Sequence, residues 1–309
     1  MTDDVIHIVL ICDDKYAQHT AVTIVSVVKN TKRKVHFYVF DFGILPENLE
    51  RLKRLDVGSN VVEVVRVQKV GAFDRFRQSY FPDAMYRLMV PEILPNLDKA
   101  LCLDSDVVVV RDIGLVYDID LGDKLLAGND ALEFYEDQIA DMECGFHCGK
   151  IYFHCGFLLM NLKKMREWSF CEKLIEITKS VPLFTYLDQG VLYFLLDDCH
   201  WKVLSRSCFL FLMFSSDTIY PSVCYHYSGK PWLVPEFLMC FLPGMFWNIM
   251  HKYYKYLSYT PWKDCKNKYI NLRITAVFFV KWLLHRNRFL FRDKLMDPFK
   301  PIIEEIKKA

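Results

Sequence analysis

Residues 101–110 read LCLDSDVVVV, an apolar run that two carboxylates, one residue apart, interrupt. Such a run predicts a buried strand, in which an ionised carboxylate without a partner is very costly. A divalent cation offsets that cost, because Mg²⁺ and Mn²⁺ prefer oxygen ligands and leave positions open for the phosphates of a substrate. Asp104 and Asp106 therefore either hold a metal ion on a diphosphate or cap a strand at a solvated turn. The tripeptide alone does not decide between the two, since Asp-x-Asp is common by chance.

The composition is that of a globular chain with an uneven distribution of charge. Its 309 residues allow one large domain, or one domain with an appendage, and a hydrophobic share of 52% is ample for a core. The net charge of +1 conceals a basic tail, because residues 250–309 carry 14 Lys and Arg but only 5 Asp and Glu. The remainder of the chain is correspondingly acidic.

The cysteines indicate a reducing compartment. Their number, eleven, is odd and their spacing is irregular, which favours buried thiols over a disulfide framework. A cluster of five Cys and His residues raises the possibility of zinc, but its spacing matches no usual ligand pattern: Cys144, His147, Cys148, His154 and Cys155. The N-terminal residues show no secretory pattern, so the cytoplasm is the expected compartment.

Apolar strands alternate with amphipathic helices along the first 230 residues. Strands are expected at 5–12, 35–40, 61–67, 100–103, 151–162 and 223–227, and helices at 16–30, 46–55, 85–94, 163–179 and 187–196. This alternation predicts an α/β fold with a mostly parallel, doubly wound sheet. Ligands of such sheets bind beyond the carboxyl ends of the strands, where Asp13, Asp14 and Asp104 are all expected.

The segment after Trp232 has a different character. Residues 232–250 are nearly all apolar, but Pro235 and Pro243 argue against a continuous membrane span. Further on, aromatic and aliphatic residues alternate with Lys and Arg, a mixture that favours an anionic membrane surface over nucleic acid. The alternative is a helical subdomain that packs its apolar face on the sheet.

Six motifs follow one another between residues 6 and 232: CDDKYA (12–17), YRL (86–88), LDSD (103–106), FHCGFLLMNL (153–162), LDQG (187–190) and HYSGKPW (226–232). In this order and spacing they resemble glycosyltransferase family 8, the retaining nucleotide-sugar transferases. The run YLSYTPWK (256–263) resembles the C-terminal extension of the family's bacterial lipopolysaccharide core hexosyltransferases. The resemblance implies a GT-A type, Rossmann-like catalytic domain at residues 1–235 and a helical, membrane-associating extension at residues 236–309.

The resemblance also implies the parts of a donor site. Asp104, Asp106 and His226 would hold Mn²⁺ or Mg²⁺ on the diphosphate of a UDP-hexose, and Lys230 would neutralise charge on the departing UDP. Gly229 would let the backbone approach the phosphates. The implied donor-binding residues are Cys12, Asp13, Lys15, Tyr16, Arg87, Asp104, Ser105, His154, Cys155, Gly156, Asp188, Gln189, Gly229 and Lys230.

Two residues are assigned to catalysis by the same resemblance. Asp188 would bind hydroxyls of the transferred sugar, and Gln189 would lie nearest the anomeric carbon. An uncharged amide is a poor nucleophile, which fits front-face substitution better than double displacement, although the sequence leaves both open. The chain departs from the family pattern at His154, where the family has Asn, and in the motif around Gly229 and Lys230, which is two residues short.

These observations predict a metal-dependent, retaining transferase that moves glucose or galactose from UDP to a lipopolysaccharide core or related glycolipid. The enzyme is expected at the inner face of the cytoplasmic membrane, with the basic tail as its contact and without nucleic acid as a partner. Two alternatives stay open. One is a non-catalytic relative that binds nucleotide and scaffolds partners, and the other is a soluble family member with a non-lipid acceptor. The sequence does not indicate the oligomeric state.

Overall fold

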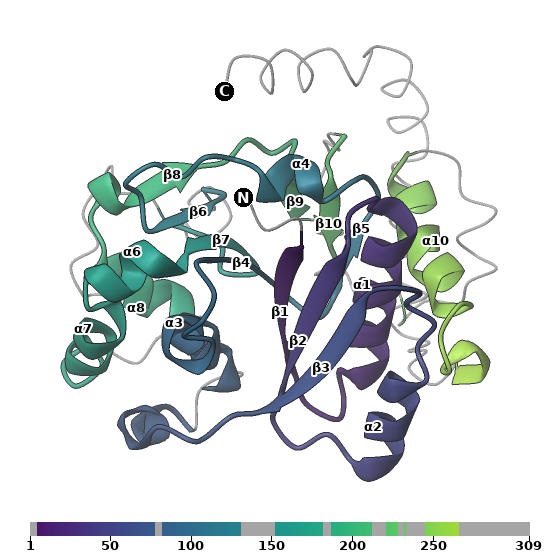
Figure 1. Cartoon of the computed structure of the whole chain (residues 1–309), viewed down its shortest axis with the longest axis horizontal. Helices are drawn as coiled ribbons and strands as arrows, with labels where there is room; N and C mark the ends of the chain where they lie inside the picture. Colours follow the sequence, from purple (N-terminus) through teal and green to yellow (C-terminus); the bar gives the residue numbers. More distant parts are fainter. Residues whose placement is uncertain are drawn as a thin grey trace, which may run out of the picture.

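A seven-stranded sheet forms the centre of the molecule in the computed structural model (Figure 1). The structure describes residues 5–77, 82–130, 152–181, 187–211, 221–227, 232 and 245–265. The strand order is β3-β2-β1-β4-β7-β6-β8, with bounds β1 Ile6–Cys12, β2 Val35–Asp41, β3 Val61–Arg66, β4 Lys99–Leu103, β6 Leu126–Gly128, β7 Phe157–Asn161 and β8 Trp201–Val203. Four of the six neighbouring pairs are parallel, which confirms the predicted mostly parallel α/β sheet.

Strand β7 is the exception that positions the site. It runs antiparallel to both of its neighbours, and its first residue, Phe157, pairs with Leu103 at the end of β4. The residues just before β7 therefore lie beside Asp104, which follows β4. If β7 were parallel to β4, residues 154–156 would lie beside the start of β4 instead of beside Asp104.

A second sheet of three strands adjoins the first. It has the order β5-β10-β9, with β5 at Val107–Val109, β9 at Phe209–Phe211 and β10 at Cys224–His226. Strand β10 runs antiparallel to β5, and His226 pairs with Val107. This register brings His226 next to Asp106, although 120 residues separate them in the sequence.

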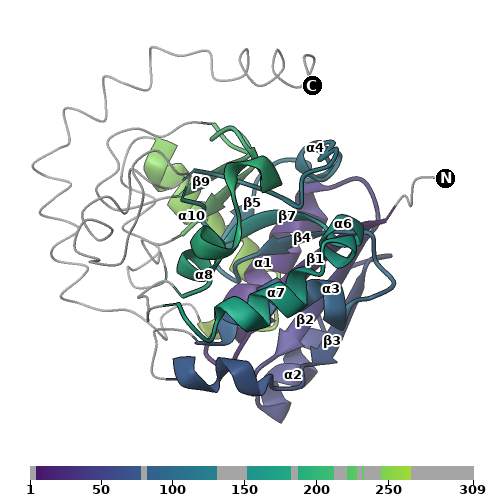
Figure 2. The same ribbon diagram turned by 90° about the vertical axis from the view of Figure 1, so that its left-hand side faces the viewer.

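Helices cover both faces of the large sheet, as Figures 1 and 2 show. Their bounds are α1 Ala17–Asn30, α2 Pro46–Lys53, η1 Gly71–Phe76, η2 Pro82–Met89, α3 Val90–Ile93, α4 Gly114–Tyr117, α6 Leu162–Glu167, α7 Phe170–Ile177, α8 Leu187–Leu195, η3 Asp198–His200, α10 Met245–Leu257 and η5 Lys263–Cys265. Successive side chains of a strand point to opposite faces. Ile8 and Leu10 of β1 accordingly join the core under α1, and Val9 and Ile11 join the core under η2, α7 and α8.

Two helices differ from the predicted ones. The helix expected at 163–179 is broken into α6 and α7 at Ser169, whose φ of 55° is left-handed and cannot continue an α-helix. The helix expected at 85–94 is the 3₁₀ helix η2 followed by the short α3, which carries Pro91 in its first turn. Proline fits there because the first helical N–H groups have no intrahelical partner.

Helix α10 packs against α1 within the main core. Tyr253, Tyr254 and Leu257 are buried there, together with Trp262 just beyond the helix. The described part of the extension thus fits the alternative of a helical segment packed on the catalytic fold. A domain boundary at residue 235 stays a prediction, and residues 266–309 lie outside the described residues. No helix in the described ranges is both long and apolar enough to cross a membrane.

Candidate active site

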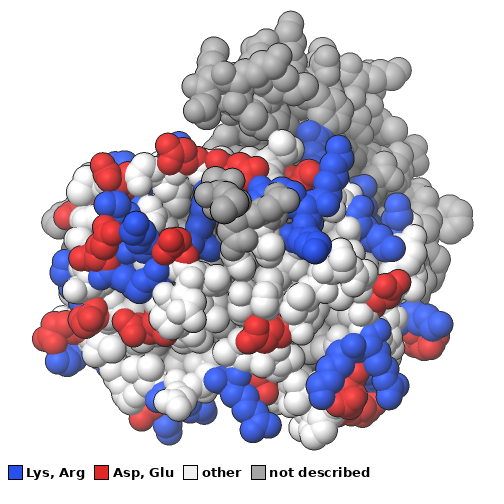
Figure 3. Space-filling view, viewed as in Figure 1, with Lys and Arg blue, Asp and Glu red and all other residues white. Residues whose placement is uncertain are grey.

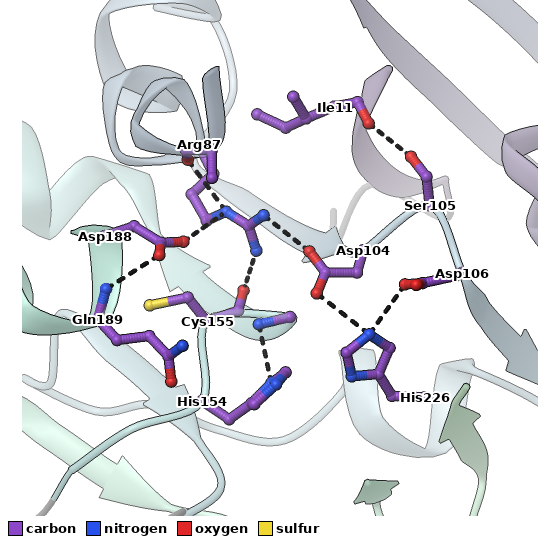
Figure 4. A network of polar contacts seen from close by, with 12 residues as sticks. Ile11, Arg87, Asp104, Ser105, Asp106, His154, Cys155, Asp188, Gln189 and His226 are labelled. Atoms are coloured by element: carbon purple, nitrogen blue, oxygen red, sulfur yellow. Dashed lines mark hydrogen bonds and ion pairs between the residues drawn. The ribbon is translucent and has the colours of Figure 1, made fainter. Parts of the chain in front are cut away.

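Three segments that are distant in the sequence meet at Asp104 (Figure 4). The Asp104 amide donates to the Gly156 carbonyl at 2.9 Å, which continues the pairing of β4 with β7 by one residue. Arg87 Nη2 donates to Asp104 Oδ1 at 2.7 Å, and Asp104 Oδ2 lies 3.4 Å from His226 Nε2. Desolvation opposes ionisation of Asp104, but Arg87 and His226 outweigh it and hold the pKa of this carboxyl at about 2.

Arg87 links this carboxylate to Asp188. Its side chain is 4% exposed. Arg87 Nε lies 3.0 Å from Asp188 Oδ2 and also donates to the Ala84 carbonyl, and Nη1 donates to the Cys155 carbonyl. Burial opposes the charge, but Asp104 and Asp188 raise the pKa of Arg87 well above its usual value, so the guanidinium stays charged. Each of its three nitrogens already has an acceptor inside the protein. The predicted reach of Arg87 to the diphosphate or sugar stays a prediction.

His226 and Asp106 form the other half of the predicted metal site. His226 Nε2 lies 2.8 Å from Asp106 Oδ1, and both side chains are mostly buried. Burial opposes protonation of His226, but Asp106 outweighs it and raises the pKa of the imidazole. The structure thus brings Asp104, Asp106 and His226 together as the sequence predicted. Two carboxylates that both approach one imidazole nitrogen supply the ligand types that fit Mn²⁺ or Mg²⁺.

His154 and Gly156 lie next to these residues. The Gly156 amide donates to His154 Nδ1 at 3.0 Å, and the His154 ring centroid lies 5.0 Å from that of His226. Burial and the neighbouring His226 lower the pKa of His154 to about 3, so its imidazole is neutral. A Cβ on Gly156 would lie 2.4 Å from Asp104 Oδ2, which leaves room for glycine alone. One potential ligand atom each from Asp104, His154 and His226 lies within 4.8 Å of the others.

Asp188 and Gln189 begin helix α8. The Asp188 carboxylate accepts the Gln189 amide through Oδ1 at 3.0 Å and faces Arg87 through Oδ2. Burial raises the pKa of Asp188, although Arg87 opposes the shift. The side chain of Gln189 is buried and projects toward the His154 side of the site in Figure 4. Both predicted catalytic residues therefore belong to the same network as the predicted metal ligands.

The side chains of the turn after β1 mainly bind other groups of the protein. Asp13 Oδ1 accepts the Tyr16 amide at 2.9 Å, and Asp14 Oδ1 accepts the Leu45 amide at 2.9 Å, so both carboxylates order turns. Cys12 accepts a hydrogen bond from the Thr20 hydroxyl, and burial raises its pKa to about 12. Lys15 is exposed. Donor binding by Cys12, Asp13, Lys15 and Tyr16 stays a prediction, as does donor binding by Cys155, whose pKa burial also raises.

Two hydroxyl groups that stabilise the site, those of Ser105 and Thr23, were not predicted to do so from the sequence. Ser105 Oγ donates to the Ile11 carbonyl at 2.5 Å, and Thr23 of α1 donates to the carbonyls of Ser105 and Val107. These bonds hold the turn between β4 and β5 on β1 and α1, which gives Ser105 a structural contact alongside its predicted role. A threonine on the buried face of an amphipathic helix was the available signal. Gly229 and Lys230 lie outside the described residues, as do Cys144, His147 and Cys148.

The family assignment follows from a comparison of this sequence with known families. The sequence model of "Glycosyl transferase family 8" matches residues 7–234, the stretch that holds the whole site. The chain belongs to glycosyltransferase family 8. It is 26% identical over 288 residues to General stress protein A of Bacillus subtilis, covering 87% of this chain and 99% of that protein. It is also 32% identical over 178 residues to the glycosyltransferase GlyB of Streptococcus pneumoniae, covering 55% of this chain and 40% of that protein.

Solved structures of glycosyltransferases share the fold. The galactosyltransferase LgtC, in complex with donor and acceptor sugar analogs, superposes with a TM-score of 0.65 at 23% identity, covering 84% of this chain and 99% of that one. The bifunctional glycosyltransferase WbbM superposes with a TM-score of 0.67 at 17% identity, covering 87% of this chain and 52% of that one. The chain thus spans nearly the full length of some relatives and about half of others. The GT-A fold predicted from the resemblance is confirmed.

Proposed function

We propose that this family 8 transferase moves glucose or galactose from a UDP-sugar to a glycolipid acceptor, with retention of configuration and with a bound Mn²⁺ or Mg²⁺. The observation that carries the proposal is the convergence of Asp104 and Asp106, in the turn between β4 and β5, with His226 of β10, beside the Arg87–Asp188 pair. A metal ion there neutralises charge on the diphosphate of the departing UDP. LgtC, a galactosyltransferase with the same fold, supports the choice of a hexose donor.

The residues of the chain bind and orient the donor. Arg87 contacts Asp188 through Nε and Asp104 through Nη2. It therefore fixes the distance between Asp188, which we assign to the sugar, and Asp104, which we assign to the metal on the diphosphate. Asp188 accepts hydrogen bonds from sugar hydroxyls, and the Gln189 amide lies at the reacting face. Because an amide is a poor nucleophile, the leaving phosphate takes the proton of the acceptor hydroxyl on the front face of the sugar.

The experiment is a donor screen that reads UDP release with and without Mn²⁺. UDP-glucose or UDP-galactose should give release that a chelator abolishes, and Asp106→Ala should lower the rate at least a hundredfold. Asp118→Ala, at an exposed carboxylate directly after α4 that pairs with Arg33, is the matched control and should leave the rate unchanged. Absence of chelator-sensitive release from every donor, with Asp106→Ala the same as wild type, contradicts the proposal. Tight donor binding without turnover would favour the nucleotide-binding scaffold instead.

The acceptor and location are proposed from the tail. Residues 250–309 have a net charge of +9 interleaved with aromatic side chains, which suits an anionic membrane surface at the inner face of the cytoplasmic membrane. On the face shown in Figure 3, basic and acidic side chains of the described residues are interspersed, so this face offers no comparable basic patch. The likeness of YLSYTPWK to the extension of lipopolysaccharide core transferases supports a glycolipid acceptor.

Truncation after Cys265 tests the membrane contact. This cut keeps α10, whose Tyr253, Tyr254 and Tyr256 are buried in the core, and removes most of the basic residues of the tail. The full chain should sediment with vesicles that contain anionic lipid and the truncated chain should not, while both keep the same rate on a water-soluble acceptor. If neither chain sediments with the vesicles, the membrane proposal is contradicted and a soluble transferase with a non-lipid acceptor is favoured. If both chains sediment equally well, the basic tail is not the membrane contact.

A further inference from the structure

His154 lies within bonding range of the site assigned to the metal. Its side chain is buried, and its candidate ligand atom lies within 4.8 Å of those of Asp104 and His226 (Figure 4). Two ligands on opposite sides of one divalent cation are about 4.4 Å apart, given metal–ligand bonds a little over 2 Å. The three atoms therefore span the distance that one ion bridges after a small adjustment of the side chains.

Gly156 permits this approach. A Cβ at this position would lie 2.4 Å from Asp104 Oδ2, 2.5 Å from His154 Cε1 and 2.9 Å from His154 Nδ1. Because Gly156 has no side chain, the Asp104 carboxylate and the His154 imidazole both lie next to the space that a Cβ would fill. The antiparallel pairing of β7 with β4 fixes that arrangement, because it places residues 154–156 alongside Asp104.

We propose that His154 is a further protein ligand of the metal, so that the site offers two imidazoles in addition to Asp104 and Asp106. This inference rests on the metal site of the proposed function. Imidazole nitrogen is a softer ligand than a carboxylate oxygen and suits Mn²⁺ and later first-row ions better than Mg²⁺. The second histidine therefore narrows the choice of metal toward Mn²⁺.

The tautomer of the ring indicates which nitrogen binds. Nδ1 accepts the Gly156 amide, so in the neutral ring the proton is on Nε2 and the lone pair on Nδ1 is occupied by that amide. Ligation through Nδ1 exchanges the Gly156 amide for the cation and releases no proton. The cost is one backbone hydrogen bond, which the new metal–nitrogen bond replaces.

The test titrates the full chain with Mn²⁺ in the absence of donor and follows the free ion by electron paramagnetic resonance. His154→Asn should weaken Mn²⁺ binding at least tenfold but change Mg²⁺ binding, measured by competition, less than threefold. Electron spin echo modulation of the bound ion should fall from two imidazole nitrogens to one. His36→Asn, at a histidine of β2 that pairs with Glu63 of the edge strand β3, is the control and should change neither measurement.

A second variant guards against a loss of folding. His154→Gln carries an amide on a longer side chain, and far-ultraviolet circular dichroism shows whether each variant keeps the wild-type fold. Unchanged Mn²⁺ affinity and unchanged nitrogen modulation in both folded variants overturn the assignment of His154. That result leaves Mn²⁺-dependent UDP release intact, whereas a wild-type chain that binds no Mn²⁺ and releases no UDP overturns the proposed function itself.

Discussion

Arg87 shows how much a single buried side chain contributes to this site. It is the positive partner of both Asp104 and Asp188, at 2.7 Å and 3.0 Å. Removing one member of a buried ion pair leaves an uncompensated charge and costs about 3–5 kcal/mol. Because Asp104 keeps 23% of its side chain exposed, we expect Arg87→Met to lower the free energy of unfolding by about 3 kcal/mol, measured by urea denaturation.

The exposed pair of Arg77 with Asp74 provides the control. Both side chains are more than half exposed, so Arg77→Met should change the unfolding free energy by no more than about 0.5 kcal/mol. Equal effects of the two variants would show that Arg87 is not important for stability.

The stability that the Arg87–Asp104 pair contributes also depends on pH, since the folded pKa of Asp104, about 2, lies below its unfolded value. It is complete above about pH 4 and is lost as the pH falls toward 2, so the difference between wild type and Arg87→Met should narrow there.

Gly156 is the residue-scale test of close approach. Alanine there would place its Cβ 2.4 Å from Asp104 Oδ2, and either Asp104 or His154 must then move away. A ligand displaced by about 1 Å costs on the order of a hundredfold in activity, so we expect Gly156→Ala to lose UDP release and Mn²⁺ affinity together. Gly71→Ala, where nothing lies within 4 Å of the added Cβ, should retain both. Wild-type Mn²⁺ affinity in Gly156→Ala would contradict the close packing of Asp104 against this backbone.

At the scale of elements, α10 is attached to α1 through two tyrosine hydroxyls: Tyr256 OH accepts Asn30 Nδ2 at 2.8 Å, and Tyr253 OH has two partners. Tyr253 OH accepts Gln18 Nε2 at 3.0 Å and lies 2.7 Å from His19 Nδ1, while His19 stacks on Trp232. Tyr253→Phe leaves these buried partners without the hydroxyl and should cost about 1–3 kcal/mol, measured by thermal or urea unfolding. Tyr259→Phe, at a half-exposed ring, should be nearly neutral. If both variants unfold alike, the Tyr253 hydroxyl does not hold α10 in place.

The elements that the sequence predicted well are those with a local signal. Strands β1 to β4 and helix α1 have apolar periodicity that survives in the fold, and the LDSD motif ends a strand as expected. The direction of β7 was not predictable, because an apolar strand reads the same in parallel and antiparallel pairing. The break at Ser169 had no Gly or Pro to announce it. The aromatic pattern of α10 is compatible with either a core or a membrane surface, so only the packing on α1 separates the two for Tyr253 and Tyr254.

At the scale of the whole molecule, the site depends on contacts between distant segments. The motifs predicted that Asp104, Asp106 and His226 belong together, but the pairing of β10 with β5 brings them together in space. That Arg87 binds partners inside the protein was not predictable from the sequence, because a guanidinium in a helical turn fits an internal partner and a substrate equally well. Residue types carry the chemistry of such a site, whereas its internal connections depend on tertiary packing.

The cysteines report on the integrity of the whole fold. Burial raises the pKa of Cys12 and of Cys102 to about 12, whereas Cys199 is exposed. At pH 8 a thiol of pKa 12 is thiolate in roughly one molecule in ten thousand, and only the thiolate reacts. Native protein treated with iodoacetamide at pH 8 should therefore be modified at Cys199 in minutes and at Cys12 and Cys102 only after unfolding in urea, as peptide mass mapping would show. Raising the pH to 9.5 should still leave the two buried thiols protected, because their pKa of about 12 lies well above that pH. Modification of Cys102 in the native state would mean that strand β4, and with it Asp104, opens to solvent without global unfolding.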